Sequence, residues 1–80
     1  MTASIRIARL VRAARRYPLL RRGLLVRALR LCQQALSTQG VNEERVLWLG
    51  IIWWQLGERR RGHDLFRAVQ ERRVLARKSP

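Results

Sequence analysis

The sequence predicts an all-α fold in which four antiparallel helices form two hairpins, and three observations carry this prediction. Hydrophobic residues recur at intervals of three and four along most of the chain, as they do on one face of an α-helix. No stretch shows the alternation of polar and apolar residues that a half-buried β-strand requires. Proline, glycine and asparagine divide the 80 residues into four segments joined by short turns.

The first helix is expected over residues 4–16. Its apolar residues lie on one face and its arginines on the other: Ile7, Leu10, Val11 and Ala14 against Arg9, Arg12 and Arg16. Tyr17 and Pro18 should end it, because a residue before proline is pushed out of the helical region. An acid-free amphipathic helix of this kind is also typical of a mitochondrial presequence or of a membrane-surface helix, so those two alternatives stay open.

The second helix is expected from Leu19 or Leu24 to Ser37, with Gly40 after its end. Its apolar set is Leu24, Leu25, Ala28, Leu31, Cys32, Ala35 and Leu36. Asn42 is a suitable N-cap for the third helix, because Glu43 and Glu44 then occupy its positively polarised first turn. This third helix, residues 43–56, is apolar almost all round, so neighbours should cover it on every side.

Gly57 should stop the third helix, and residues 58–61 should form a charged turn. The fourth helix is then expected from Gly62 to Arg73 or beyond. Together the four helices make one domain, in which residues 1–42 form its basic first part, residues 43–76 its second hairpin and residues 77–80 a tail.

The chain matches itself at an offset of 34 residues. The aligned pairs are Gly23 with Gly57, Arg27 with Arg61, Ala28 with Gly62, Leu31 with Leu65, and Cys32 with Phe66. This offset is the period of the tetratricopeptide repeat. Residues 43–76 resemble one such repeat, with its pattern carried by Val46, Leu49, Gly50, Trp53, Gly62 and Phe66. Residues 9–42 resemble a degraded copy, in which Pro18 interrupts the first helix and Arg16 replaces a glycine.

The resemblance implies peptide or protein binding, with the first helix of each repeat lining a concave face. The partner-binding residues are then expected to be Leu47, Trp48, Ile51 and Trp54. Leu49 and Trp53 would face the fourth helix instead. Gly50 and Gly62 would let the two helices approach closely, while Trp53 and Phe66 fill the space between them. The open alternative is that Trp48 and Trp54 merely pack on one of the first two helices.

The charge is large and unevenly distributed. The formal net charge is +13, and residues 1–42 hold nine arginines and no acid, whereas residues 43–80 hold nine basic and five acidic residues. The expected basic surface comprises Arg15, Arg16, Arg21, Arg22, Arg59, Arg60 and Arg61. A field this positive attracts an acidic protein, a nucleic acid or an anionic membrane. Arginine-rich composition also arises from codon use in a GC-rich genome.

We expect no catalysis, metal site, cofactor or small-molecule substrate. His63 and Asp64 are adjacent and so do not face each other on a helix, and Cys32 fits a small core residue. The leading hypothesis is a protein-binding adaptor, chaperone or accessory subunit of a larger complex, such as a secretion-system or membrane-associated assembly, in a bacterial cytoplasm. Its partner would present an acidic and apolar surface. The alternatives are a nucleic-acid-binding or ribosome-associated protein, and a mitochondrial or peripheral membrane protein anchored by its first helix.

Overall fold

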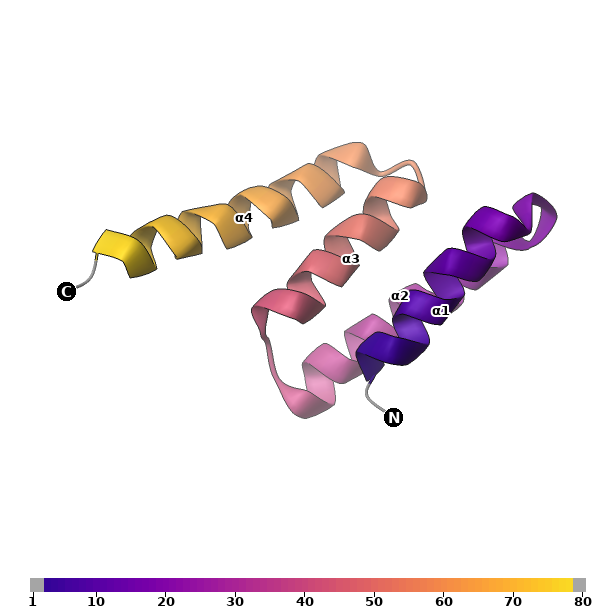
Figure 1. Ribbon diagram of the computed structural model, residues 1–80, viewed down its shortest axis with the longest axis horizontal. Coiled ribbons are helices and arrows are strands. Elements are labelled where there is room, and N and C mark those ends of the chain that lie inside the picture. Colours follow the sequence, from indigo (N-terminus) through magenta and orange to yellow (C-terminus); the bar gives the residue numbers. More distant parts are fainter. Residues whose placement is uncertain (1–2, 79–80) are drawn as a thin grey trace.

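The computed structural model describes residues 3–78, and all the regular structure in that range is helical (Figure 1). The helices are α1 (Ala3–Arg16), α2 (Arg21–Gln39), α3 (Glu43–Gln55) and α4 (Arg59–Lys78), and a short 3-10 turn, η1 (Pro18–Leu20), joins α1 to α2. The predicted all-α class is therefore confirmed, together with the break at Tyr17 and Pro18.

Local residue chemistry accounts for most helix ends. Gly40 adopts a φ of 89° directly after α2, a conformation that other residues rarely take. Asn42 caps α3, since its side chain accepts a hydrogen bond from the Arg45 backbone N–H at 2.8 Å. Gly57, with a φ of 93°, ends α3 in a Schellman motif, in which the Gly57 and Glu58 N–H groups donate to the Trp54 and Trp53 carbonyls.

The bounds of two helices differ from the predictions. The helix α4 begins at Arg59 rather than Gly62, and the Gly62 N–H already donates to the Glu58 carbonyl at 3.1 Å, as in the first turn of a helix. The predicted charged turn at residues 58–61 is thus largely the first turn of α4. The helix α2 begins at Arg21 after η1 and continues to Gln39, two residues past Ser37, because Gly40 is the first residue able to stop it.

The helices pack in chain order. The hairpin of α1 and α2 contacts one side of α3, and α4 lies against the other side of α3 (Figure 1). Within residues 3–78, α4 contacts no other helix. The main core accordingly lies among α1, α2 and α3, and its buried members are Ile7, Val11, Ala14, Leu25, Ala28, Cys32 and Ile52. The apolar face predicted for the first helix is therefore buried in the protein.

Glycine brings α3 and α4 into close contact, as predicted. A Cβ atom added to Gly62 would lie 2.7 Å from the Gly50 carbonyl oxygen, and one added to Gly50 would lie 2.8 Å from the Phe66 ring. Phe66 therefore fills the space above Gly50. The aromatic residue beside Phe66 is Trp54, with ring centroids 6.4 Å apart, whereas the sequence analysis assigned that place to Trp53.

Candidate functional site

The four predicted partner-binding residues of α3 do not form an open apolar stripe. Trp48 and Ile51 are partly buried against the core of the first three helices. Trp54 keeps 44% of its surface exposed but packs on Phe66, because Gly50 and Gly62 bring α4 onto this face. Leu47 is partly buried. Trp48 thus packs on the core cluster, while Trp54 packs on Phe66 of α4.

Two further side chains of α3, Leu49 and Trp53, were predicted to face α4. Leu49 packs against the core around Ile52. Trp53 lines a groove with Leu25 and Val26 of α2, and the Arg61 guanidinium lies 4.8 Å from its ring centroid. Gly50 faces α4 as predicted, but Trp54 also lies on that side, beside Phe66, while Trp53 lies between α2 and Arg61 of α4.

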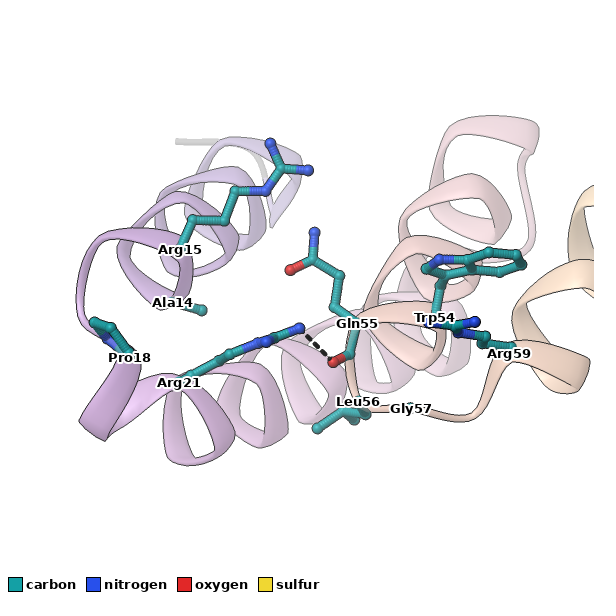
Figure 2. Close-up of a pocket in the computed structure, with 9 residues that line it drawn as sticks. All are labelled: Ala14, Arg15, Pro18, Arg21, Trp54, Gln55, Leu56, Gly57 and Arg59. Atoms are coloured by element: carbon teal, nitrogen blue, oxygen red, sulfur yellow. Dashed lines mark hydrogen bonds between the residues drawn. The ribbon is translucent and has the colours of Figure 1, made fainter.

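Three of the predicted basic residues lie together at the C-terminal end of α3. Arg15, Arg21 and Arg59 line one groove there, together with Trp54 and Gln55 (Figure 2). Figure 2 shows Arg21 reaching across from α2, where its Nη2 donates to the Gln55 carbonyl at 2.9 Å. This contact satisfies a carbonyl at the negatively polarised end of α3.

Other arginines at this end also have structural contacts. The Gln55 side chain extends toward Arg15, and turning its amide by 180° places the oxygen 3.2 Å from Arg15 Nη2. The Arg59 guanidinium lies 5.9 Å from a Trp54 ring centroid, within the range of a cation–π contact. Arg16, Arg22 and Arg60 are exposed. All seven predicted arginines are thus exposed, and Arg21, Arg59 and Arg61 also contact residues of α3.

A second groove, which the sequence analysis did not identify, lies between α1 and α2. Four exposed arginines line it, two from each helix, and Leu10, Leu31 and Gln34 complete the lining: the arginines are Arg6, Arg9, Arg27 and Arg30. We call this the α1–α2 groove. Its volume is about 540 Å³, within the range of roughly 300–1,000 Å³ that is common for ligand sites.

The hairpin geometry explains this cluster. Arg6 and Arg9 are three residues apart on α1, as are Arg27 and Arg30 on α2, so each pair shares a helix face. Since the hairpin is antiparallel, the start of α1 lies beside the later part of α2. The repeated spacing was visible in the sequence, but the pairing of the two helices was needed to bring both pairs together.

The α1–α2 groove lacks compensating negative charge within residues 3–78. The one ion pair of that range joins Arg73 to Glu43 and belongs to the second hairpin. Its hydrogen bond from Arg73 lowers the pKa of the Glu43 carboxyl, so Glu43 is held ionised by its own partner. Uncompensated guanidinium groups attract anions and bind carboxylates or phosphates by paired hydrogen bonds. Anion binding is therefore the chemistry this groove offers.

The remaining chemically active residues are placed as structural or solvated groups. Cys32 is buried, its Sγ donates to the Arg45 carbonyl at 3.2 Å, and burial raises the pKa of its thiol. His63 and Asp64 are both exposed on α4. Among residues 3–78, no three His, Cys, Asp or Glu side chains gather as a metal site would require.

No protein-family model, curated protein or solved structure matches this chain. In the described part of the chain, every helix is too short or too polar to cross a membrane.

Proposed function

We propose that this protein is a small helical interaction module, related in design to tetratricopeptide repeats, that binds an acidic segment of a partner protein in the α1–α2 groove. It would act as an adaptor, chaperone or accessory subunit rather than as an enzyme. The observation that carries the proposal is the set of four exposed arginines beside half-buried leucines, with no acid in the same hairpin.

The lining of the groove favours a protein segment over a nucleic acid. Leu10 and Leu31 supply apolar surface between the guanidinium groups, which suits a segment that alternates carboxylate and aliphatic side chains. A phosphodiester backbone would pair with the arginines but leave the leucines without a partner. Binding of single-stranded nucleic acid also uses aromatic side chains for base stacking, and none lines this groove.

The helix order supports the repeat-like part of the proposal. Each helix packs on the next along the chain, and α1 also touches α3, as expected of two stacked helical hairpins. Such arrays are stabilised by neighbouring repeats, and two repeats are fewer than independent stability usually requires. An acidic partner on the first hairpin would supply part of the missing contact and neutralise its charge.

Fluorescence anisotropy with a short labelled peptide of alternating Glu and Leu tests this proposal. The groove variant Arg9→Gln/Arg27→Gln removes two charges from opposite walls, whereas Arg67→Gln/Arg77→Gln removes two exposed charges from α4 as a matched control. We expect the groove variant to bind about tenfold more weakly, which corresponds to about 1.4 kcal/mol. The control variant should stay within about twofold of the parent protein, since it keeps the groove and matches the change in net charge.

Two results would contradict the proposal. Equal loss in both variants would mean that the peptide responds only to total charge. A peptide with Ser in place of Leu that binds as tightly as the original would remove the role of the apolar lining. Preferential binding of an RNA oligonucleotide, with a steep salt dependence, would instead favour the nucleic-acid alternative.

A further inference from the structure

The turn between α1 and α2 exposes a cluster of large apolar side chains. Leu19 is 100% exposed, Leu20 is 60% exposed and Tyr17 is 53% exposed, and Pro18 between them is exposed as well. We call residues 17–20 the hairpin tip. Isolated exposed apolar residues are normal on a protein surface, but four in succession form a patch of the kind that marks an interaction site.

Arginines flank the hairpin tip on both sides. Arg15 and Arg16 end α1, and Arg21 and Arg22 begin α2, so the apolar turn is bordered by four cations. The hairpin itself holds no acidic residue, and one carboxylate, that of Glu58, shares a groove with Pro18, Arg21 and Arg22, so the charge around the tip is positive overall. The tip therefore combines apolar surface at its end with positive charge at its base, and Figure 1 shows this turn at one end of the molecule.

The backbone of the tip is suited to leaving water. The Tyr17 N–H donates to the Ala13 carbonyl at 2.9 Å, and the Leu20 N–H donates to the Tyr17 carbonyl at 3.0 Å. Arg21 donates its N–H to the Pro18 carbonyl, and Pro18 has no N–H to satisfy. These hydrogen bonds reduce the number of backbone polar groups that would have to leave water unpaired if the tip entered an apolar phase.

We propose that the hairpin tip inserts into the interface of an anionic lipid bilayer. Leu19 and Leu20 would enter the acyl region, and Tyr17 would lie at the headgroup level, where its ring is apolar and its hydroxyl reaches water. The flanking arginines would meet the anionic headgroups, each strengthening binding by about fivefold. Arg16 and Arg22 are available for this role, whereas Arg15 and Arg21 also contact Gln55.

A bilayer fits this surface better than a protein partner does. The tip is a convex protrusion whose outermost side chain, Leu19, has no neighbour covering it. A bilayer accepts such a protrusion without a preformed cavity and presents negative charge around it. The proposal also differs from anchoring by the amphipathic first helix, because Ile7, Val11 and Ala14 of that helix are buried in the core.

Cosedimentation of the full chain with vesicles tests the proposal. Vesicles of phosphatidylcholine with phosphatidylserine are compared with vesicles of phosphatidylcholine alone. We expect Leu19→Ser/Leu20→Ser to lower the affinity for the mixed vesicles at least about tenfold. The control Val41→Ser, at a side chain that is 67% exposed in another turn, should leave it unchanged. Circular dichroism checks that both variants keep the parent helicity, which is expected because neither tip residue is buried.

An environment-sensitive dye separates insertion from adsorption of the basic surface. The variants Leu19→Cys and Val41→Cys are each labelled with a nitrobenzoxadiazole dye, while buried Cys32 reacts far more slowly. Insertion predicts a blue shift of the dye at position 19, but not at position 41, on addition of mixed vesicles. Absence of vesicle binding, or binding without that shift, would overturn the proposal. Acidic-peptide binding should be unchanged in Leu19→Ser/Leu20→Ser, so the groove and the tip are tested separately.

Discussion

The close contact between α3 and α4 predicts opposite effects for two glycine-to-alanine substitutions. A Cβ atom at Gly62 would lie 2.7 Å from the Gly50 carbonyl oxygen and 3.1 Å from the Trp54 Cβ atom. The Gly50 carbonyl oxygen is a backbone atom and cannot move aside as the end of a flexible side chain can. A Cβ atom at Gly62 therefore forces α4 away from α3. At Gly23, also helical, an added Cβ atom would meet nothing within 4 Å. Gly23→Ala is therefore the matched control for Gly62→Ala.

The expected magnitudes follow from two opposing terms. Replacing a helical glycine by alanine stabilises a helix by about 0.5–1 kcal/mol, and this gain applies at both positions. Overpacking costs about 1–3 kcal/mol and applies only at Gly62. Gly23→Ala should therefore stabilise the protein, while Gly62→Ala should destabilise it by up to about 2.5 kcal/mol. Because a domain of this size changes its Tm by about 4–8 °C per kcal/mol, the two variants should differ by at least about 4 °C.

Thermal and urea unfolding, followed by far-ultraviolet circular dichroism and tryptophan fluorescence, measures both variants. If Gly62→Ala proves as stable as Gly23→Ala, the two helices are not in contact at this point and the packing argument fails. A second comparison removes the obstacle rather than adding one. Gly50→Ala should be destabilising alone but less so beside Phe66→Leu, since Phe66 is the side chain that a Cβ atom at Gly50 would meet.

Three further predictions concern the core, the thiol and the ion pair. Ile52 lies in the three-helix core, so Ile52→Ala should lower the free energy of unfolding by about 2–5 kcal/mol and abolish cooperative unfolding at 25 °C. Val74→Ala, at an exposed position, should change that free energy little in the same circular dichroism measurement. Cys32 should resist iodoacetamide near pH 8, because burial raises the pKa of its thiol, and should become reactive at the urea midpoint of global unfolding; rapid alkylation of the folded protein would contradict its burial. Because its hydrogen bond with Arg73 lowers the folded-state pKa of Glu43, this pair stabilises the protein above the unfolded carboxyl pKa of about 4.3 and loses that contribution as the pH falls through the folded value. Acidification should therefore lower the hydrogen-exchange protection factors of α4 around Arg73, calculated against the intrinsic exchange rate at each pH, and Glu43→Gln should show the lower protection already at neutral pH.

The sequence predicted the helix ends well because each depends on its immediate neighbours. Proline after Tyr17, the side chain of Asn42, and the positive φ of Gly40 and Gly57 act within a few residues of the boundary they set. The early start of α4 is the exception. Three arginines suggested a turn by their charge, yet arginine is a good helix former and nothing after Gly57 interrupts the helix.

The faces of α3 could not be derived in the same way. Its residues are apolar almost all round, so periodicity does not say which side meets α4. Gly50 decides this, because only the side without a side chain can receive Phe66 and Gly62. Trp54 then lies beside α4, and Leu49 turns toward the first hairpin. The repeat resemblance identified both glycines but assigned to Trp53 the place beside Phe66 that Trp54 occupies.

The positions of the basic residues follow from the pairing of α1 with α2. The antiparallel pairing brings Arg6 and Arg9 beside Arg27 and Arg30 in the α1–α2 groove, while the hairpin tip lies at the opposite end of the same two helices. All five acidic residues lie in the second half of the chain, so this hairpin must hold nine arginines without an internal counter-ion. Mutual repulsion among them opposes folding, and a bound anion relieves it. Since a ligand that binds only the folded state stabilises it, the charge that weakens the isolated domain is also what would couple its stability to an acidic partner or an anionic membrane.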